Sequence, residues 1–158
     1  MSNFSMDTKT IRPLFSRPNK LHIFAPLNND SYFASLGIPT THFHCLDWWE
    51  SRDIDVSLPC SGPDSAEIVQ ASVKLTCTPC QHLSSRTPWD LCHTLWSSWA
   101  VEDTSSSATA KSKVWFGGDT AYRTVKKGEN PADQPVCPAF KEIGDKFGQF
   151  DLALIPIG

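Results

Sequence analysis

The chain has 158 residues, a net charge of −3 and a pI near 5.9. This balance gives no electrostatic basis for binding a polyanion, and the pair Lys126-Lys127 is too short for a basic patch, so we expect no nucleic acid as a partner. No segment approaches the roughly 20 apolar residues that cross a bilayer, and no signal peptide is recognisable at the N-terminus. We therefore expect a protein that is cytoplasmic or peripheral to a membrane.

The length corresponds to about one domain, yet it is shorter than the roughly 200 to 250 residues of many α/β sandwiches. Six cysteines are spread through the chain. Because the chain has no secretory signal, this spread indicates reduced thiols rather than a disulfide framework.

The first third of the chain predicts a layered α/β arrangement. Its expected elements are a short helix, a strand, a second helix and a second strand, over residues 7–15, 21–25, 28–36 and 42–46. Asn28 or Asn29 begins the second helix and Gly37 ends it. The β-α-β order favours an α/β domain.

Two strand-end loops on opposite sides of the middle each carry a metal-binding side chain. The alternating run 71–76 precedes Thr78-Pro79-Cys80-Gln81-His82, and the apolar run 113–116 precedes Gly117-Gly118-Asp119-Thr120. Strand ends are where protein scaffolds present chemistry. His82 and Asp119 are therefore the candidate site residues.

The other segments are simpler to interpret. Residues 57–65 and 104–110 are predicted loops, 94–101 is a predicted strand, and 126–135 is a polar excursion. Residues 138–147 predict a helix whose apolar face holds Phe140, Ile143 and Phe147. Residues 152–157 predict a continuous apolar strand of the fully buried kind.

Five short pieces, in this order along the chain, resemble the metallo-β-lactamase superfamily, and within it the phospholipase D enzymes that hydrolyse N-acylphosphatidylethanolamine. They are Leu46-Asp47-Trp48-Trp49-Glu50, the Thr-Pro-x-Gln-His segment ending at His82, Leu95-Trp96-Ser97-Ser98-Trp99, the Gly-Asp-Thr-x-Tyr segment ending at Tyr122, and Cys137-Pro138-Ala139-Phe140-Lys141-Glu142-Ile143-Gly144.

The likeness implies an α/β fold, part of an αββα sandwich whose N- and C-terminal portions are missing. Residues 1–158 would form a single partial domain with apparent insertions near 59–68, 103–112 and 123–136.

The resemblance also implies a site. His82 would complete the three-imidazole set of a first zinc ion, and Asp119 would bridge two Zn²⁺ ions, with no catalytic residue beyond the metal ligands. The superfamily's His-x-His-x-Asp-His loop occurs nowhere in this chain. We therefore expect the chain to be a central fragment. Because zinc takes at least three protein ligands, we expect that this fragment does not retain its zinc.

The implied activity is zinc-dependent hydrolysis of a phosphodiester, in which a metal-bound hydroxide, available because the metal lowers the pKa of water to about 7, attacks phosphorus. The family's substrate is a phospholipid, an N-acylated phosphatidylethanolamine, which implies peripheral membrane contact. We expect this chain alone to be inactive.

Two alternatives from other classes stay open. The chain is either a non-catalytic truncated product or binding subunit, or a thiol-disulfide module at Cys77 and Cys80, which would need a thiol of depressed pKa. Taken singly, without the resemblance, His82 is better interpreted as a histidine bonded to backbone and Asp119 as a turn cap. Cys80 and His82 together are a further candidate for adventitious metal capture.

The remaining histidines and aromatic residues have packing roles in this interpretation. His42 and His44 would line one solvated face of a strand, and His22 and His93 would be surface or packing residues without a partner pattern. Most tryptophans would be core residues. Trp89 is a candidate lipid contact and Arg86 a candidate phosphate contact.

Overall fold

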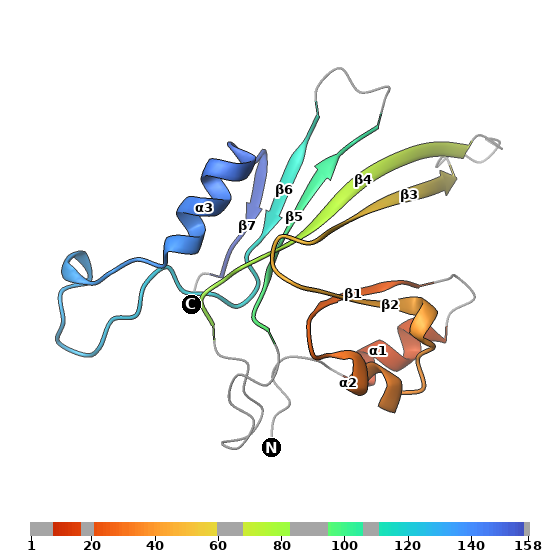
Figure 1. The fold of residues 1–158 in the computed structure, drawn as a ribbon, viewed down its shortest axis with the longest axis horizontal. Helices are drawn as coiled ribbons and strands as arrows, with labels where there is room; N and C mark the ends of the chain where they lie inside the picture. The colour runs from red at the N-terminus through yellow and green to blue at the C-terminus, as the bar shows by residue number, and fades with distance from the viewer. Residues whose placement is uncertain (1–7, 17–20, 60–67, 83–94, 106–110, 157–158) are drawn as a thin grey trace. The chain divides into compact units, whose positions relative to one another are not determined.

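The computed structural model describes residues 8–16, 21–59, 68–82, 95–105 and 111–156 (Figure 1). The chain divides into two compact units. Unit 1 comprises residues 1–47 and 82–96, and unit 2 comprises residues 48–81 and 97–158. The α/β class expected from the sequence is confirmed. In the described residues, no helix is both long and apolar enough to cross a membrane.

Unit 1 is a β-α-β arrangement preceded by a helix. Its elements are α1 (Thr8–Phe15), β1 (Ile23–Pro26), α2 (Asp30–Ser35), a 3₁₀ turn (Thr40–His42) and β2 (Phe43–Leu46). Strands β1 and β2 pair in parallel, with Ile23 opposite Phe43. The predicted order is therefore confirmed.

One face of this small sheet forms a core with the helices. Ala25, Phe33, Ile38 and Phe43 are buried together, and Ile11 and Phe15 of α1 pack against them. The predicted helix 28–36 begins at Asp30 with Asn29 as its N-cap residue, since Asn28 has φ +69°, outside the helical region. The Asn29 side-chain amide donates to the Pro26 carbonyl at 2.7 Å and makes no capping hydrogen bond. The chain leaves α2 through Gly37 at φ +79°, as a glycine there predicts.

Unit 2 contains a five-stranded sheet in the order β3-β4-β5-β6-β7. The strands are β3 (Ser51–Pro59), β4 (Ile68–Thr78), β5 (Ser98–Asp103), β6 (Lys113–Phe116) and β7 (Leu152–Leu154). Pairing is antiparallel up to β6 and parallel between β6 and β7.

Strand β3 was not predicted, and the expected loop over 57–65 is wrong at its start. Residues Ser57–Pro59 belong to β3, which pairs with β4 from Ser51 opposite Thr76 to Pro59 opposite Ile68. The period of two was present in Ile54 and Val56 between polar neighbours. The proline and serine that follow obscured it, although proline is tolerated on a strand that pairs on one side only.

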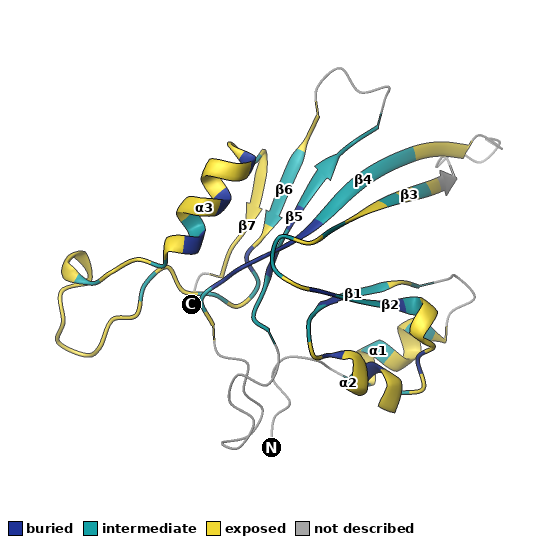
Figure 2. Ribbon diagram, in the orientation of Figure 1, coloured by how far each residue is buried: buried dark blue, intermediate teal, exposed yellow. Residues whose placement is uncertain are grey.

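Helix α3 (Pro138–Phe147) covers one face of this sheet, and the predicted apolar face is confirmed (Figure 2). Ile143 and Phe147 are buried with Ala100 of β5, while Phe140 packs against them from the edge. The Lys146 ammonium lies 5.0 Å from the centre of the Trp49 ring. Pro138 begins the helix and Gly148 ends it at φ +70°, as their positions indicated.

Strand β7 differs from its prediction. Leu152, Leu154 and Ile155 are 51%, 49% and 58% exposed, so the expectation of a fully buried strand is wrong for these residues. Among the described strands only β6 pairs with β7, which leaves its other edge uncovered by them. Residue 157, the predicted end, lies outside the described residues.

The three predicted insertions fall at connections between elements. Residues 59–68 span the connection from β3 to β4 with one residue of each strand, 103–112 span the connection from the last residue of β5 to β6, and 123–136 precede α3. The third contains a 3₁₀ turn (Pro131–Asp133) closed by a bridge between Arg123 and Val136. Residues 60–67 and 106–110 lie outside the described part of the chain, so the insertions stay predictions.

Candidate metal-binding strand ends

Three strands of unit 2 end at one edge of the sheet. Strands β4 and β6 flank β5 and both run antiparallel to it, so they share a direction, and β7 is parallel to β6 (Figure 1). Thr78 at the end of β4 is opposite Ser98, and Phe116 at the end of β6 is opposite Trp99. The two strands therefore end within one residue of the same level, about 10 Å apart across β5.

Hydrogen bonds join the two loops that follow these strands. The backbone N–H of Gln81 donates to the Thr120 hydroxyl at 2.9 Å, and the N–H of Ala121 donates to the Gln81 carbonyl at 3.1 Å. The Gln81 side-chain amide donates to the Thr124 hydroxyl at 3.0 Å. The loop after β4 is thus fixed to the loop after β6.

A buried cluster of hydroxyl groups lies under these loops. The Thr78 and Ser98 hydroxyl oxygens are 2.7 Å apart, and both residues are fully buried. The Ser98 hydroxyl also lies 2.8 Å from the Pro79 carbonyl, and the Trp115 indole N–H donates to Ser98 at 3.3 Å. This cluster holds the first residue of the β4 loop against β5 and β6.

Two glycines shape the loop after β6. Gly118 has φ +65°, a conformation that side chains with a Cβ adopt at a cost. A Cβ on Gly117 would lie 3.1 Å from the Trp115 ring. The backbone N–H of Gly117 donates to the Leu154 carbonyl at 2.9 Å. Glycine at these two positions therefore lets the loop pass close to Trp115 and Leu154.

The two predicted ligands are neighbours along the chain of the residues that join the loops, His82 in unit 1 and Asp119 in unit 2. His82 is the residue after Gln81, and Asp119 is the residue before Thr120, so each lies one residue from the hydrogen bonds that join the loops. Both side chains are exposed. Asp119 lines a cavity of about 390 Å³ at the carboxyl ends of β6 and β7, together with Phe116, Leu154 and Pro156.

The described residues do not complete a metal site. Among them, no three or more His, Cys, Asp or Glu side chains are placed to hold a metal ion. Arg86, Trp89 and His93 lie outside the described residues. The roles of His82 and Asp119 as ligands therefore stay predictions.

The structure opposes the thiol-disulfide alternative. Cys77 is fully buried within β4, and Cys80 is only 5% exposed. Burial raises the pKa of the Cys80 thiol to about 11, with the Thr120 hydrogen bond acting to lower it and the neighbouring Cys137 and Asp119 to raise it. A redox module needs the opposite shift.

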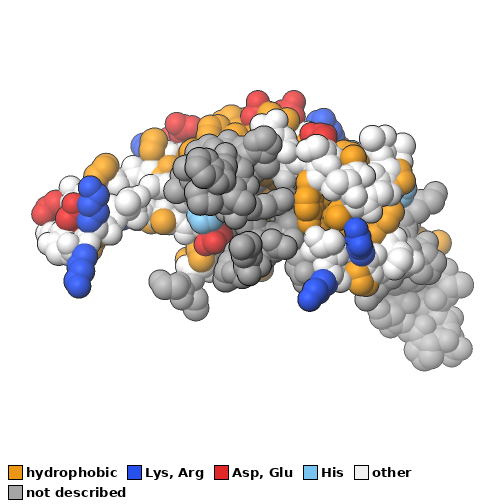
Figure 3. All heavy atoms as spheres, turned by 90° about the horizontal axis from the view of Figure 1, so that it is seen from below, with side chains coloured by type: hydrophobic (Ala, Val, Ile, Leu, Met, Phe, Trp, Pro, Cys, Tyr) orange, Lys and Arg blue, Asp and Glu red, His pale blue; other side chains and the backbone are white. Residues whose placement is uncertain are grey.

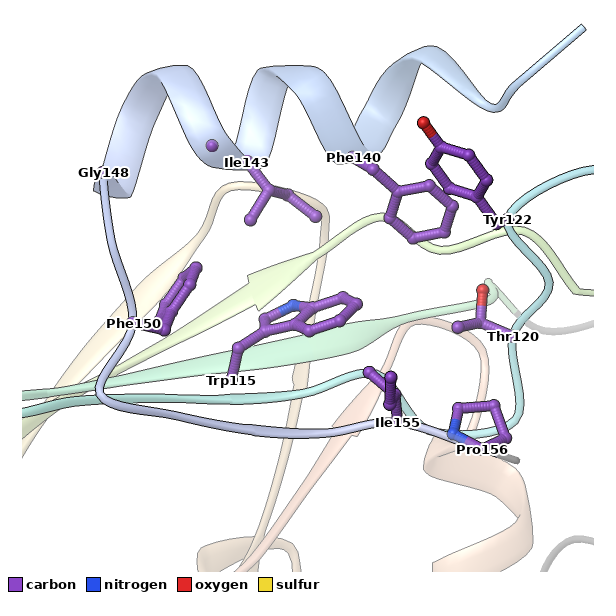
Figure 4. A pocket seen from close by; sticks show the side chains of 10 residues that line it. Trp115, Thr120, Tyr122, Phe140, Ile143, Gly148, Phe150, Ile155 and Pro156 are labelled. Atoms are coloured by element: carbon purple, nitrogen blue, oxygen red, sulfur yellow. The ribbon is translucent and has the colours of Figure 1, made fainter.

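A second, apolar cavity adjoins the Thr120 loop. It occupies about 450 Å³ between α3 and the sheet, and Figure 4 shows the Trp115 ring facing Ile143 and Phe140 across it. Thr120 and Tyr122 line one end of the cavity, where the Tyr122 ring stacks on Phe140 with the ring centroids 5.8 Å apart.

The described surface shows no concentration of positive charge over the face drawn in Figure 3. The lysine and arginine side chains there are scattered among acidic and apolar ones.

Comparison with known proteins agrees with this fold. The chain matches the family described as "Beta-lactamase superfamily domain" over residues 6–158. It is 37% identical to N-acyl-phosphatidylethanolamine-hydrolyzing phospholipase D 1 of Caenorhabditis elegans, with 97% of this chain and 35% of that protein covered. It is 29% identical to uncharacterized proteins of Mycobacterium bovis and Mycobacterium tuberculosis, with 84% of this chain and 26% of each covered. The chain thus spans about a third or less of the length of these relatives, and it belongs to the metallo-β-lactamase superfamily.

Proposed function

We propose that the chain is part of a zinc-dependent phosphodiester hydrolase of the N-acylphosphatidylethanolamine phospholipase D type, with His82 and Asp119 among its metal ligands. One observation carries this proposal above the others. The ends of β4 and β6 lie level at one sheet edge, and Gln81 and Thr120 join the two loops beside the proposed ligands.

His82 and Asp119 are of residue types that bind zinc. A neutral imidazole nitrogen and a carboxylate oxygen are both zinc ligands, and zinc takes at least three from the protein. The described residues hold no group of three or more such side chains, so further ligands would have to come from outside them. When bound, the metal would polarise the phosphoryl group and lower the pKa of a bound water to about 7.

The chain's own residues would hold these ligands in place. The Thr120 hydroxyl fixes the backbone before His82, while Gly118 gives the turn that presents Asp119. The Ser98 and Thr78 hydroxyls anchor the start of the β4 loop from below. A ligand shifted by about 1 Å would reduce the rate substantially.

The substrate class follows from the nematode relative's name together with the apolar cavity. A volume of about 450 Å³ is within the usual range of about 300 to 1,000 Å³ for small-molecule sites. Its apolar lining suits an acyl chain, and Thr120 and Tyr122 continue from the loop that carries Asp119. A phospholipid substrate with peripheral membrane contact is consistent with this lining.

A chimera tests the proposal. The 158 residues of this chain replace the matched segment of the nematode enzyme, and hydrolysis of N-acylphosphatidylethanolamine is measured in the metal-loaded protein. We expect turnover that falls by at least about 10²-fold in H82A and in D119A. A folded, metal-loaded chimera without turnover would overturn the proposal.

The isolated 158-residue chain gives the complementary result. We expect no turnover and no stoichiometric zinc, because His82 and Asp119 alone are too few ligands. Tightly bound zinc with turnover in this chain would contradict the expected inactivity. An inactive chimera together with binding of the isolated chain to an enzyme subunit would favour the non-catalytic alternative.

A further inference from the structure

The β1-β2 sheet of unit 1 carries histidines on the face that is turned away from the core. His44 is opposite Phe24 in the parallel register, while Ala25 and Phe43, on the other face, belong to the buried core. Since side chains alternate along a strand, His22 lies on the same face as Phe24. His22 and His44 therefore meet on one surface of the sheet, where His22 is exposed and His44 is half-buried.

The two imidazole rings share a hydrogen bond. His22 Nδ1 lies 3.0 Å from His44 Nε2, and the ring planes are 12° apart with the centroids 5.3 Å apart. In such a bond, one ring nitrogen donates its proton and the other accepts it. The expectation that His22 has no partner is therefore wrong, because strand pairing brings together positions that are distant along the chain.

The number of protons on the two rings decides whether this bond exists. Two neutral rings provide one donor and one acceptor at the contact. One added proton leaves an imidazolium that donates to a neutral ring, and such a charge-assisted bond is stronger. A second added proton leaves no acceptor, because both contacting nitrogens then carry hydrogen, and it places two positive charges side by side. The bond is therefore compatible with one added proton and not with two.

We propose that the His22–His44 pair is a pH-sensitive connection between β1 and β2, joined near neutral pH and separated when both rings are protonated. Histidine ordinarily takes up its proton at about pH 6.5, so acidification below that range drives the change. The exposure of His22 gives protons access from solvent. Because the joined pair holds one added proton and the unfolded chain can hold two, the stability of unit 1 should fall as the pH falls.

The side chains packed around the pair bring a further imidazole. Phe24 stacks on His44 with the ring centroids 4.8 Å apart, and the His42 ring stacks on that of His22 at 5.1 Å. Phe15 of α1 packs edge-on against His42, with the ring centroids 5.3 Å apart. Protonation of His42 would therefore add positive charge beside the pair.

The charged residues of the same elements do not offset this positive charge. Helix α1 contributes Lys9 and Arg12, which are both basic, and β1, β2 and the 3₁₀ turn of unit 1 contain no acidic residue. Helix α2 contains Asp30, whose side chain makes a hydrogen bond with Cys45. Cys45 follows His44 in β2 and therefore lies on the other face of the sheet. The acidic residue of the described elements of unit 1 is thus on the core side.

His42 provides a matched control for the pair. Its Nδ1 donates to the Leu21 carbonyl at 2.9 Å. A protonated imidazole still donates at that nitrogen, so this hydrogen bond survives acidification. Replacement of His42 removes a neighbouring charge and leaves the bond between His22 and His44 in place.

Amide hydrogen exchange of the 158-residue chain at pH 7 and pH 5, measured by mass spectrometry, tests the proposal. The rates are corrected for the intrinsic exchange rate at each pH. We expect the protection of the β1 and β2 amides to fall at least about tenfold at pH 5, against less than about threefold for β4 and β5.

The variants assign this fall to the pair. In H22Q it should be less than about threefold, because a glutamine amide offers both a donor and an acceptor and can bond to His44 in either protonation state. H44Q should behave as H22Q does, and H42Q should keep a fall of at least about fivefold. Because His22 is exposed, H22Q keeps the fold even if H44Q does not.

Protection of β1 and β2 that stays unchanged between pH 7 and pH 5 in the unaltered chain would overturn the inference. An equal fall in the unaltered chain and in H22Q would overturn it too, because the pair would then have a structural role only. The same holds for an equal fall in β1-β2 and β4-β5, which would indicate general loosening in acid. None of these outcomes bears on the proposed hydrolase, because His82 and Asp119 are unaltered in every variant.

Discussion

The Thr120 hydroxyl accepts a hydrogen bond from the backbone N–H of Gln81 at 2.9 Å, although the two residues are 39 positions apart in the chain. The same hydroxyl lies 3.2 Å from the Gln81 carbonyl. One side chain thus joins the loop after β4 to the loop after β6. His82 follows Gln81 and Asp119 precedes Thr120 in the chain, so under the proposed function this contact would position the backbone beside both ligands.

Replacing Thr120 with valine should therefore affect activity more than a surface change does. T120V leaves the Gln81 N–H without its acceptor, at a cost of about 1 to 3 kcal/mol. We expect the isolated chain to unfold at lower urea concentration and the chimera to lose at least about tenfold in kcat/KM. T124V is the matched control, because the exposed Thr124 hydroxyl accepts from the Gln81 side chain and not from its backbone. Equal losses in both variants would show that the Thr120 contact has no special role.

Ser98 is the centre of the buried hydroxyl cluster, so S98A should destabilise unit 2. The substitution removes the acceptor of the Trp115 indole N–H and the partner of the Thr78 hydroxyl. Buried polar groups left unpaired cost about 1 to 3 kcal/mol each, and urea unfolding measures the change. S57A removes an exposed hydrogen bond to Gln70 and should cost less than about 0.5 kcal/mol. A stable S98A would mean that the cluster does not anchor the β4 loop.

Replacement by alanine at two glycines should change the free energy of unfolding in opposite directions. G118A forces a Cβ into φ +65°, which costs about 1 to 2 kcal/mol. Gly144 lies within α3 with no atom within 4 Å of an added Cβ, so G144A should stabilise the chain by about 0.5 to 1 kcal/mol. Thermal unfolding of both variants measures the difference. Destabilisation by G144A would mean that this position of α3 is constrained by more than helix propensity.

The raised pKa values of the Cys45 and Cys80 thiols predict how the stability of the folded chain depends on pH in the alkaline range. Burial raises the pKa of each thiol from 9.0 to about 11 in the folded chain, and for Cys45 a hydrogen bond to Asp30 adds to the effect. The folded state therefore holds these protons more tightly than the unfolded state does. The corresponding stability is fully present below pH 9 and is lost as the pH rises through 11. The urea concentration at the midpoint of unfolding should fall from pH 8 to pH 9.5 and again to pH 10.5. This fall should be smaller in C45A/C80A than in the unaltered chain.

Thiol labelling addresses the redox alternative directly. At pH 8 the buried Cys80 should react with iodoacetamide more slowly than the half-buried Cys137, because burial limits access of the reagent and raises the pKa of the Cys80 thiol. Peptide mapping by mass spectrometry separates the two sites. Rapid labelling of Cys80 near neutral pH would revive the thiol-disulfide interpretation.

Local patterns predicted several elements well. The apolar spacing of Phe140, Ile143 and Phe147, with Pro138 before it and Gly148 after it, gave α3 its limits. The alternation before His82 and the apolar run before Asp119 gave β4 and β6, and therefore the two loops of the candidate site. These features depend on neighbours within a few residues, which is the range that hydrophobic periodicity reports.

Other features depended on pairing between distant segments. Strand β3 ended in residues that resemble a loop, and its partner β4 decided its conformation. The exposure of β7 depended on which strands flank it, and the contact of His22 with His44 depended on the parallel register of β1 and β2.

The sequence by itself determined the superfamily, the α/β class and the two candidate ligands, because short motifs and local periodicity carry that information. Only the tertiary structure decided that β4 and β6 end level on either side of β5 and that Thr120 joins their loops. The physical reason is that strand order and register arise from hydrogen bonds between residues far apart in the chain, and a local pattern does not specify which strands will pair.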